Sequence, residues 1–237
     1  MEKKEQLYEG KAKKVFATED PELLIVAYKD DATAFNGLKK GTISGKGIIN
    51  NQMSNRLMSM LESKGIPTHY VQELSQRETL VKKVQIVPLE VIVRNISAGS
   101  FSKRYGVQEG IVFQQPTIEF SYKNDELGDP LLNTRHALAL ELATQEEIAT
   151  IEDYSFRINE ALKSFWLSCG VTLVDFKLEF GRLQDGTIVL ADEISPDTCR
   201  LRDSKTGEKL DKDRFRRDLG GVEEAYGEIM RRLEANI

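Results

Sequence analysis

Charged side chains alternate with apolar ones in the segment "LVDFKLEFG", residues 173–181. As a strand, this segment places Asp175, Lys177 and Glu179 on one face and its apolar residues on the other. The Asp-Gly pair at 185–186 predicts a two-residue turn, and the returning strand then places Asp192 opposite Glu179. Two carboxylates in this relation repel each other unless a divalent cation such as magnesium (Mg²⁺) binds both, and Lys177 could then contact a phosphate. The hairpin face therefore predicts a metal and phosphoryl site, although a solvated outer face of a sheet would show the same alternation.

Three groups of basic residues could bind anionic parts of a substrate. In "VRNISAGSFSKRYG", Arg94 and Ser100 lie at the start of a short helix and could bind a terminal phosphate, or they mark an ordinary helix start. In "DEISPDTCR", a turn at 195–197 would return Arg200 to the hairpin face, unless it is only a helix cap beside a solvated arginine. In "YEGKAKKVF", Lys11 and Lys13 share a strand face that could follow the phosphates of a nucleotide, or they protect a sheet edge.

Two other polar segments carry less information. The segment "GTISGKG", residues 41–47, resembles a phosphate-binding P-loop, but its glycine spacing is wrong and Gly47 stands where a hydroxyl should bind magnesium. We therefore exclude a P-loop. The segment "YKNDELGDP" offers Lys123, Asp125 and Asp129, which could equally belong to a plain polar loop.

Several classes of chemistry are excluded by what the sequence lacks. Its two histidines, His69 and His136, have no partner motif, which argues against a histidine triad or a zinc site. Its two cysteines, Cys169 and Cys199, form no C-x-x-C pair, which argues against a disulfide framework. No G-x-S-x-G or G-x-G-x-x-G occurs, and a net charge of −5 gives no global attraction for nucleic acid.

The elements that must position these residues are short strands and a few helices. Strands are expected in "QLYEGKAKKVFAT", "LLIVAYKD", "TLVKKVQIV" and "LEVIVRN", and helices over about 48–64 and in "SFSKRYG". A long helix is expected from the capping box of Thr144 and Glu147 to Gly170, and one or two helices around Gly220 and Gly221. Pro88 cannot donate to a central sheet ladder, so we place a strand break and a boundary between two lobes near it.

Composition favours a globular protein without a membrane segment. The chain of 237 residues can bury a substantial core, and no apolar run approaches the ~20 residues that cross a bilayer. The N-terminus, "MEKKEQLYEGKAKK", lacks the apolar stretch of a secretory signal. We therefore expect a cytoplasmic protein with no membrane partner and no nucleic-acid partner.

Taken together, the motifs resemble those of the phosphoribosylaminoimidazole-succinocarboxamide synthase (SAICAR synthetase) family of purine biosynthesis. The segments "LVDFKLEFG" and "LADEISPDTCR" look like its two signature segments, and "YEGKAK", "VPLEVIVRNISAGS", "KNDELGDP" and "DKDRFRRDLGG" resemble its other blocks in the same order. The resemblance implies an α+β fold with antiparallel sheets and a two-lobed, kinase-like or ATP-grasp-like nucleotide cleft. Residues 1–86 would form a small nucleotide-covering lobe, and residues 87–237 a larger substrate and metal-binding lobe.

The resemblance also implies the reaction and the residues that bind the nucleotide. The family joins L-aspartate to the carboxylate of carboxyaminoimidazole ribotide and cleaves ATP to ADP and phosphate. Glu179 and Asp192 would bind magnesium, and Lys11 and Lys13 would contact the phosphates of ATP. The backbone from Val81 through Lys82 to Ile86 would hold the adenine, and Lys123 is a weaker candidate for nucleotide contact.

On the substrate side, the resemblance implies that Arg94, Ser100 and Arg200 bind the ribotide phosphate. Asp175 and Lys177 would orient the amine and carboxylate of the imidazole beside the γ-phosphate. Two positions depart from the family pattern: Cys199 stands where many members carry a hydroxyl residue, and Asn36 where some carry an aspartate. The loop around Asn36 leaves the L-aspartate pocket unassigned.

The chemistry suits this reaction, because phosphorylating a carboxylate creates a leaving group that an amine can displace. A small-molecule kinase that uses the same cleft remains an alternative, as does a nucleotide sensor without turnover. We expect a homodimer, since closed two-fold assemblies are the commonest.

Overall fold

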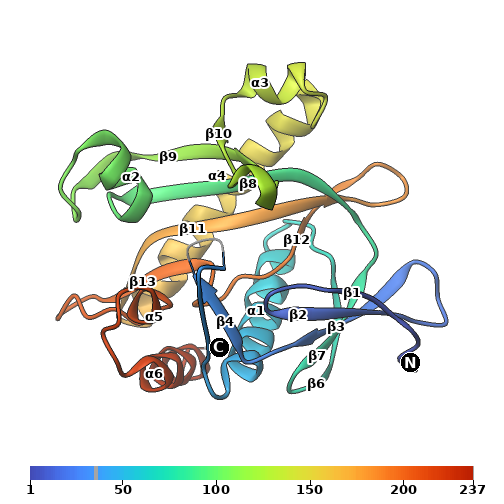
Figure 1. Ribbon diagram of the computed structural model, residues 1–237, viewed down its shortest axis with the longest axis horizontal. Coiled ribbons are helices and arrows are strands. Elements are labelled where there is room, and N and C mark those ends of the chain that lie inside the picture. The colour runs from blue at the N-terminus through green and yellow to red at the C-terminus, as the bar shows by residue number, and fades with distance from the viewer. Residues whose placement is uncertain (35–36, 237) are drawn as a thin grey trace.

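The computed structural model describes residues 1–34 and 37–236 and contains two main antiparallel sheets (Figure 1). The five-stranded sheet has the spatial order β1 (Gln6–Glu9), β2 (Lys13–Ala17), β3 (Leu23–Tyr28), β7 (Glu78–Lys82) and β6 (Tyr70–Ser75). The six-stranded sheet runs β10 (Leu131–Leu132), β9 (Val112–Tyr122), β8 (Gln85–Ile96), β11 (Val171–Arg182) and β12 (Ile188–Ala191), and β13 (Cys199–Asp203) also pairs with β11. A two-stranded sheet joins β4 (Asp31–Ala34) to β5 (Lys39–Thr42). The expected mixed fold with antiparallel sheets is confirmed.

Strand β11 lies at the centre of the larger sheet because it is paired on both edges. One edge pairs with β8 along residues 175–182, and the other pairs with β13 along its first half and with β12 along its second half. The side chains of Phe176, Leu178 and Phe180 enter the main core, as the alternation predicted. A strand fixed on both edges and on one face can hold the side chains of its other face in defined positions.

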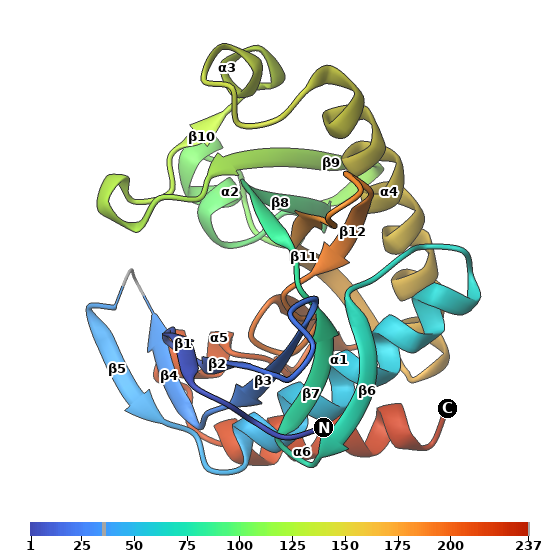
Figure 2. The same ribbon diagram turned by 90° about the vertical axis from the view of Figure 1, so that its right-hand side faces the viewer.

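Helices cover the core side of this sheet (Figure 2). The helices that contribute to this core are α1 (Lys46–Ser63), α3 (Thr134–Ala139), α4 (Gln145–Ser168) and α6 (Val222–Glu234). Three short helices lie outside it: α2 (Gly99–Tyr105), η1 (Asp125–Leu127) and α5 (Asp213–Arg216). The capping box of Thr144 and Glu147 opens α4 as predicted, and Gly170 follows its end with φ 68°. Ile158, Leu162 and Trp166 of α4 are fully buried in the core that also contains the inner face of β11. The long helix therefore supports β11 from behind.

Pro88 does not break its strand, so the predicted strand break is wrong. Strand β8 continues from Gln85 to Ile96. Its pairing with β11 shifts register between Glu179 and Gly181, and its pairing with β9 begins only at Leu89. Pro88 therefore lies at a β-bulge and beyond the end of the β9 ladder, where a missing N–H is tolerated.

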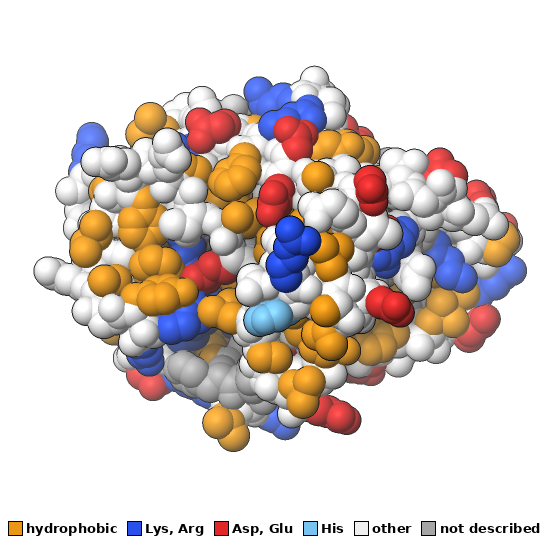
Figure 3. All heavy atoms as spheres, turned by 90° about the horizontal axis from the view of Figure 1, so that it is seen from above, with side chains coloured by type: hydrophobic (Ala, Val, Ile, Leu, Met, Phe, Trp, Pro, Cys, Tyr) orange, Lys and Arg blue, Asp and Glu red, His pale blue; other side chains and the backbone are white. Residues whose placement is uncertain are grey.

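The outer surface mixes charges of both signs. On the face shown in Figure 3, basic and acidic side chains occur in small groups among apolar ones. None of the helices in the described part of the chain is long and apolar enough to cross a membrane.

The bulge near Pro88 requires a glycine at position 181. A Cβ on Gly181 would lie 2.5 Å from Cγ2 and 2.6 Å from Cβ of Val84, so Gly181→Ala must displace the chain between β7 and β8. We expect it to lower the free energy of unfolding by about 1–3 kcal/mol, as overpacking does. Urea-induced unfolding measures this change.

Gly227→Ala is the matched control, because Gly227 lies in α6 with open space around its Cα. That substitution should raise the free energy of unfolding by about 0.5–1 kcal/mol. Equal changes for the two alanine variants would contradict the predicted clash at Val84.

Candidate active site

One cleft of about 1200 Å³ collects all the residues that the sequence predicted for nucleotide, metal and substrate contact. Its lining comes from the five-stranded sheet on one side and from β8 and β11 on the other. The predicted residues that line it are Lys11, Lys13, Val81, Lys82, Ile86, Arg94, Ser100, Lys123, Asp175, Lys177, Glu179, Asp192 and Arg200. The polar face of β11 is therefore the wall of a cleft and not a solvated outer face.

The register of the β11–β12 hairpin differs from the predicted one. Glu179 pairs with Ala191, so the placement of Asp192 directly opposite Glu179 is wrong. The loop spans 183–187: the Leu183 N–H donates to the Thr187 carbonyl at 2.9 Å, and the Gly186 N–H donates to the Leu183 carbonyl at 3.0 Å. Gly186, with φ 85°, follows the tight turn instead of forming its centre. This longer loop shifts every pair by one residue.

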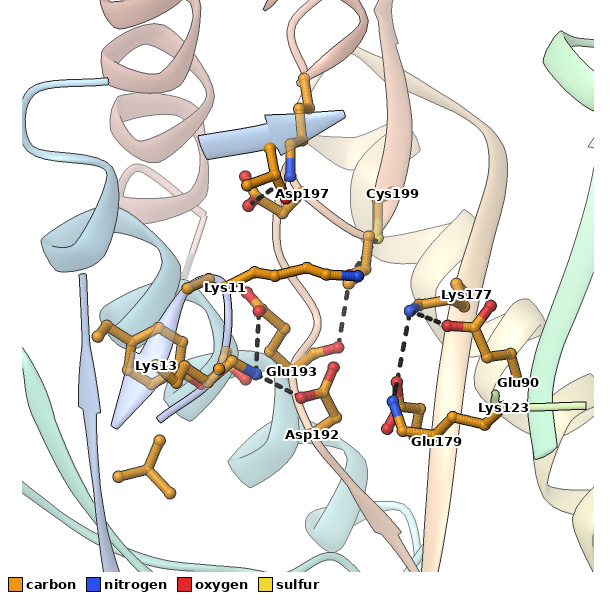
Figure 4. Close-up of a pocket in the computed structure, with 18 of the residues that line it drawn as sticks. Lys11, Lys13, Glu90, Lys123, Lys177, Glu179, Asp192, Glu193, Asp197 and Cys199 are labelled. Atoms are coloured by element: carbon orange, nitrogen blue, oxygen red, sulfur yellow. Dashed lines mark hydrogen bonds and ion pairs between the residues drawn. The ribbon is translucent and has the colours of Figure 1, made fainter. Parts of the chain in front are cut away.

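Asp192 reaches the cleft because the chain leaves the strand there. Its φ of 56° lies in the left-handed region, which costs a non-glycine residue roughly 1–2 kcal/mol. Its carboxylate forms an ion pair with Lys13, which extends from β2 of the other sheet. The ammonium group of Lys13 also lies 2.9 Å from Oε1 of the buried Glu193 (Figure 4). Lys13 therefore connects the five-stranded sheet to the segment that follows β12.

These charges fix the protonation states around Lys13. Burial alone would lower the pKa of Lys13, but Asp192 and Glu193 raise that pKa well above its ordinary value. Burial alone would raise the pKa of Asp192, but Lys13 and Lys177 hold it below its ordinary value. Lys13 is therefore cationic and Asp192 anionic at neutral pH.

Lys177 lies between two carboxylates on the cleft wall (Figure 4). Its ammonium group is 2.6 Å from Glu90 on β8 and 3.3 Å from Glu179, and Lys123 approaches Glu179 to 2.9 Å. Burial and the charge of Asp192 raise the pKa of Glu179, while Lys177 and Lys123 oppose that rise. The repulsion between Glu179 and Asp192 thus persists in spite of two nearby lysines, and a further cation would relieve it.

Arg94, Asp175 and Arg200 form a row across three strands. Asp175 pairs directly with Arg94 of β8 and with Arg200 of β13. Its carboxylate accepts from Arg94 at 2.6 Å and from Arg200 at 3.0 and 3.1 Å. Arg94 also donates to Ser100 at 3.1 Å and to Glu119 at 2.9 Å. The three residues predicted for phosphate contact, Arg94, Ser100 and Arg200, therefore meet at one end of the cleft, and Asp175 connects the two arginines.

The remaining predicted residues lie toward the five-stranded sheet. Lys11 is half exposed, and its ammonium group lies 2.9 Å from Asp125 in the loop that contains η1. Lys82 donates to the Thr68 carbonyl at 3.0 Å. Val81 belongs to a small apolar cluster with Val26, and Ile86 lines the cleft close by in sequence. This end of the cleft is the more apolar one.

Sequence reasoning did not assign five carboxylates that hold the basic residues of the cleft. They are Glu90, Glu119, Glu193, Asp197 and Asp213. Glu90 and Arg94 share the alternation of β8, which could have suggested a second polar strand face. Cys199 is buried, and burial raises the pKa of its thiol far above the ordinary value, so the thiol stays protonated. Asn36 lies outside the described residues.

Comparison with known proteins identifies the family. The family model for SAICAR synthetase matches residues 6–233. The chain belongs to the SAICAR synthetase family. A phosphoribosylaminoimidazole-succinocarboxamide synthase of Lachnoclostridium phytofermentans is 65% identical over 233 residues, which cover 98% of this chain and 99% of that one. A protein of the same name from Caldanaerobacter subterraneus subsp. tengcongensis is 63% identical over 234 residues, which cover 99% of each chain.

Solved structures of SAICAR synthetases share the fold over nearly the whole chain. The enzyme from Ehrlichia chaffeensis superimposes with a TM-score of 0.96 at 49% identity, covering 98% of this chain and 99% of that one. A SAICAR synthetase in complex with ADP superimposes with a TM-score of 0.93 at 49% identity, covering 95% of this chain and 96% of that one. The family resemblance of the sequence motifs is thereby confirmed.

Proposed function

We propose that this chain is an ATP-dependent ligase that forms SAICAR. It joins L-aspartate to the carboxylate of 5-amino-1-(5-phosphoribosyl)imidazole-4-carboxylate and releases ADP and phosphate. The observation that supports this most is the single cleft, in which Lys13, Lys177 and a carboxylate pair lie between an apolar end and an arginine-rich end. The names of the close relatives and the ADP complex of one structural neighbour agree with it.

The nucleotide lies, in this proposal, between two lobes as in kinase-like or ATP-grasp-like clefts. Residues 1–86 form the lobe that covers it, and residues 87–237 form the larger lobe. The apolar side chains of Val15, Val26 and Val81 offer a surface for the adenine, next to the backbone from Lys82 to Ile86. Lys13 crosses from the first lobe to the second and can contact phosphates from there, as can the more exposed Lys11.

Glu179 and Asp192 fit a magnesium ion. They are two mutually repelling carboxylates on one wall, and oxygen ligands are those that this ion prefers. Within residues 1–34 and 37–236, they form no group of three or more possible metal-ligating side chains, so phosphate and water oxygens would complete the shell. When bound, the ion would neutralise charge on the transferring phosphoryl group.

The ribotide would bind with its phosphate at the arginine-rich end. Arg94, Ser100 and Arg200 supply guanidinium and hydroxyl donors there, and the guanidinium of Arg200 occupies the space that a side chain at Gly99 would need. Asp175 accepts hydrogen bonds from both arginines and holds them at this end. The imidazole then lies over the middle of β11, beside Lys177.

In the proposed reaction, a ribotide carboxylate oxygen attacks the γ-phosphorus of ATP, the bond to the β-phosphate oxygen breaks, and ADP leaves. The resulting acyl phosphate is attacked by the amine of aspartate, and phosphate departs with that carboxylate oxygen. Lys177 is cationic, because Glu179 and Glu90 raise its pKa although burial alone would lower it. It can orient the carboxylate and stabilise the developing charge in the transition state.

The release of ADP under different substrate combinations tests this function. ADP should form quickly only when ATP, magnesium, the ribotide and L-aspartate are all present, and an amide product should accompany it. A kinase would release ADP over many turnovers with the ribotide alone and accumulate a phosphorylated product. A nucleotide sensor would bind ATP without turnover. Either of these results would contradict the proposal.

Asp192→Asn tests the metal assignment. The substitution removes one anionic ligand, so we expect kcat/KM to fall about a hundredfold, a loss of roughly 3 kcal/mol of transition-state stabilisation, with a higher magnesium requirement. A magnesium titration of steady-state turnover measures both effects, and circular dichroism checks folding. Asp153→Asn, in an exposed ion pair on α4, is the control. Normal turnover of Asp192→Asn at limiting magnesium would show that Asp192 is not a ligand.

A further inference from the structure

A buried ionic cluster lies behind the arginine-rich end of the cleft. The Lys46 ammonium group is 2.9 Å from Oδ2 of Asp197, and the hydroxyl of Tyr226 donates to Oδ1 at 2.6 Å. Lys46 and Tyr226 are both fully buried, whereas Asp197 lines the cleft. The proposed catalytic steps use neither Lys46 nor Tyr226, yet burying these groups has a large desolvation cost.

The segment that resembled a P-loop brings Lys46 to this place. Gly45, with φ 78°, precedes the first turn of α1, and the N–H groups of Gly45 and Gly47 donate to the carboxylate of Asp30 at 3.2 and 2.8 Å. Arg77 holds the same carboxylate at 2.7 Å. Asp30 and Arg77 thus hold the start of α1 in place, and the side chain of Lys46 extends into the protein to Asp197.

Tyr226 brings the C-terminal helix to the same carboxylate. It lies on the buried face of α6 and packs with Ala32 and Ile43 in a small apolar cluster. Asp197 thus accepts one bond from α1 and one from α6, two helices that contact each other.

On the cleft side, Asp197 holds residues that face the proposed ribotide site. Its Oδ2 lies 3.2 Å from the Lys212 ammonium group, and its carbonyl accepts from Arg216 at 3.3 Å. Arg216 and Arg200 both bond to the carboxylate of Asp213. Lys212, Arg216 and Arg200 line the same end of the cleft. A movement of Asp197 would therefore move basic groups at that end.

The charges around Asp197 are unequal in number. Two ammonium groups, Lys46 and Lys212, face one carboxylate, so the cluster carries a surplus positive charge beside the arginines. Burial alone would raise the pKa of Asp197, but Lys212, Lys46 and the Tyr226 hydroxyl hold it well below its ordinary value. Such a surplus favours an anionic ligand at this end of the cleft.

We propose that Tyr226 is a positioning residue for ribotide binding: through its hydrogen bond to Asp197 it holds Lys212 and Arg216 in place at the ribotide end of the cleft. The proposal rests on the proposed function, because that function supplies the ribotide. The nucleotide end depends on other contacts, since Lys13 bonds to Asp192 and Glu193. Loss of the Tyr226 hydroxyl should therefore weaken ribotide binding and leave nucleotide binding unchanged.

Tyr226→Phe tests the proposal by direct binding, because it removes one oxygen and retains the buried ring. Calorimetry should show a ribotide dissociation constant about tenfold higher than that of the unsubstituted protein, the scale of a lost bond to a charged group. The dissociation constant for ADP with magnesium should change less than twofold. Tyr154→Phe, at a half-buried tyrosine of α4, is the matched control and should change neither.

A double-mutant cycle shows whether the effect passes through Asp197. In an Asp197→Asn background, Tyr226→Phe should have little further effect on ribotide affinity. Three results would overturn the proposal. Tyr226→Phe could reduce ribotide affinity equally in both backgrounds, it could weaken ADP binding as much as ribotide binding, or it could leave ribotide binding unchanged. If the unsubstituted protein did not bind the ribotide, the proposed function itself would fail, which is a distinguishable result.

Discussion

The cleft depends on one constraint: Asp175 and Glu179 on the charged face of β11 are buried and Lys177 between them is partly buried, so each charge needs an oppositely charged partner. Asp175 has an arginine on each adjacent strand, and Lys177 has carboxylates on its own strand and on β8. Such partners are required because an unpaired buried charge costs several kcal/mol. The pairing of β11 on both edges holds these partners in fixed register, so the same hydrogen bonds that form the sheet also position the charged groups.

The pairing of opposite charges is least complete around Glu179 and Asp192, where the proposed chemistry takes place. Glu179 and Asp192 repel each other although Lys13, Lys123 and Lys177 are near. Buried ion pairs contribute little net stability compared with apolar residues of the same shape, which favours a functional reason for this cluster. Magnesium and the phosphates of ATP would supply the missing cation and the anions that the lysines can bind. In this view the charged groups of the cleft obtain their full set of oppositely charged partners only when magnesium and ATP bind.

The sequence predicted elements with strong local signals and failed where tertiary context decides. The capping box of Thr144 and Glu147 determines the start of α4 by local hydrogen bonds, so it could be recognised without a structure. The Asp-Gly pair at 185–186 indicated a hairpin but not its loop length, and one extra residue changed the partner of Glu179. Pro88 was wrongly expected to break β8, because a bulge depends on the neighbouring strand. The partners Glu90, Glu193 and Asp197 required the fold, since no local pattern links them to Lys177, Lys13 or Lys46.

The direct test of phosphoryl transfer on the β11 face is the fate of a carboxylate oxygen. The ribotide carboxylate would be prepared with heavy oxygen and turned over with ATP, magnesium and L-aspartate, and the products analysed by mass spectrometry. If Lys177 and the carboxylate pair hold the ribotide carboxylate in line with the γ-phosphate, one labelled oxygen should appear in inorganic phosphate and none in ADP. Unlabelled phosphate released together with the amide product would show that ATP cleavage does not pass through the carboxylate, and would contradict the proposed mechanism.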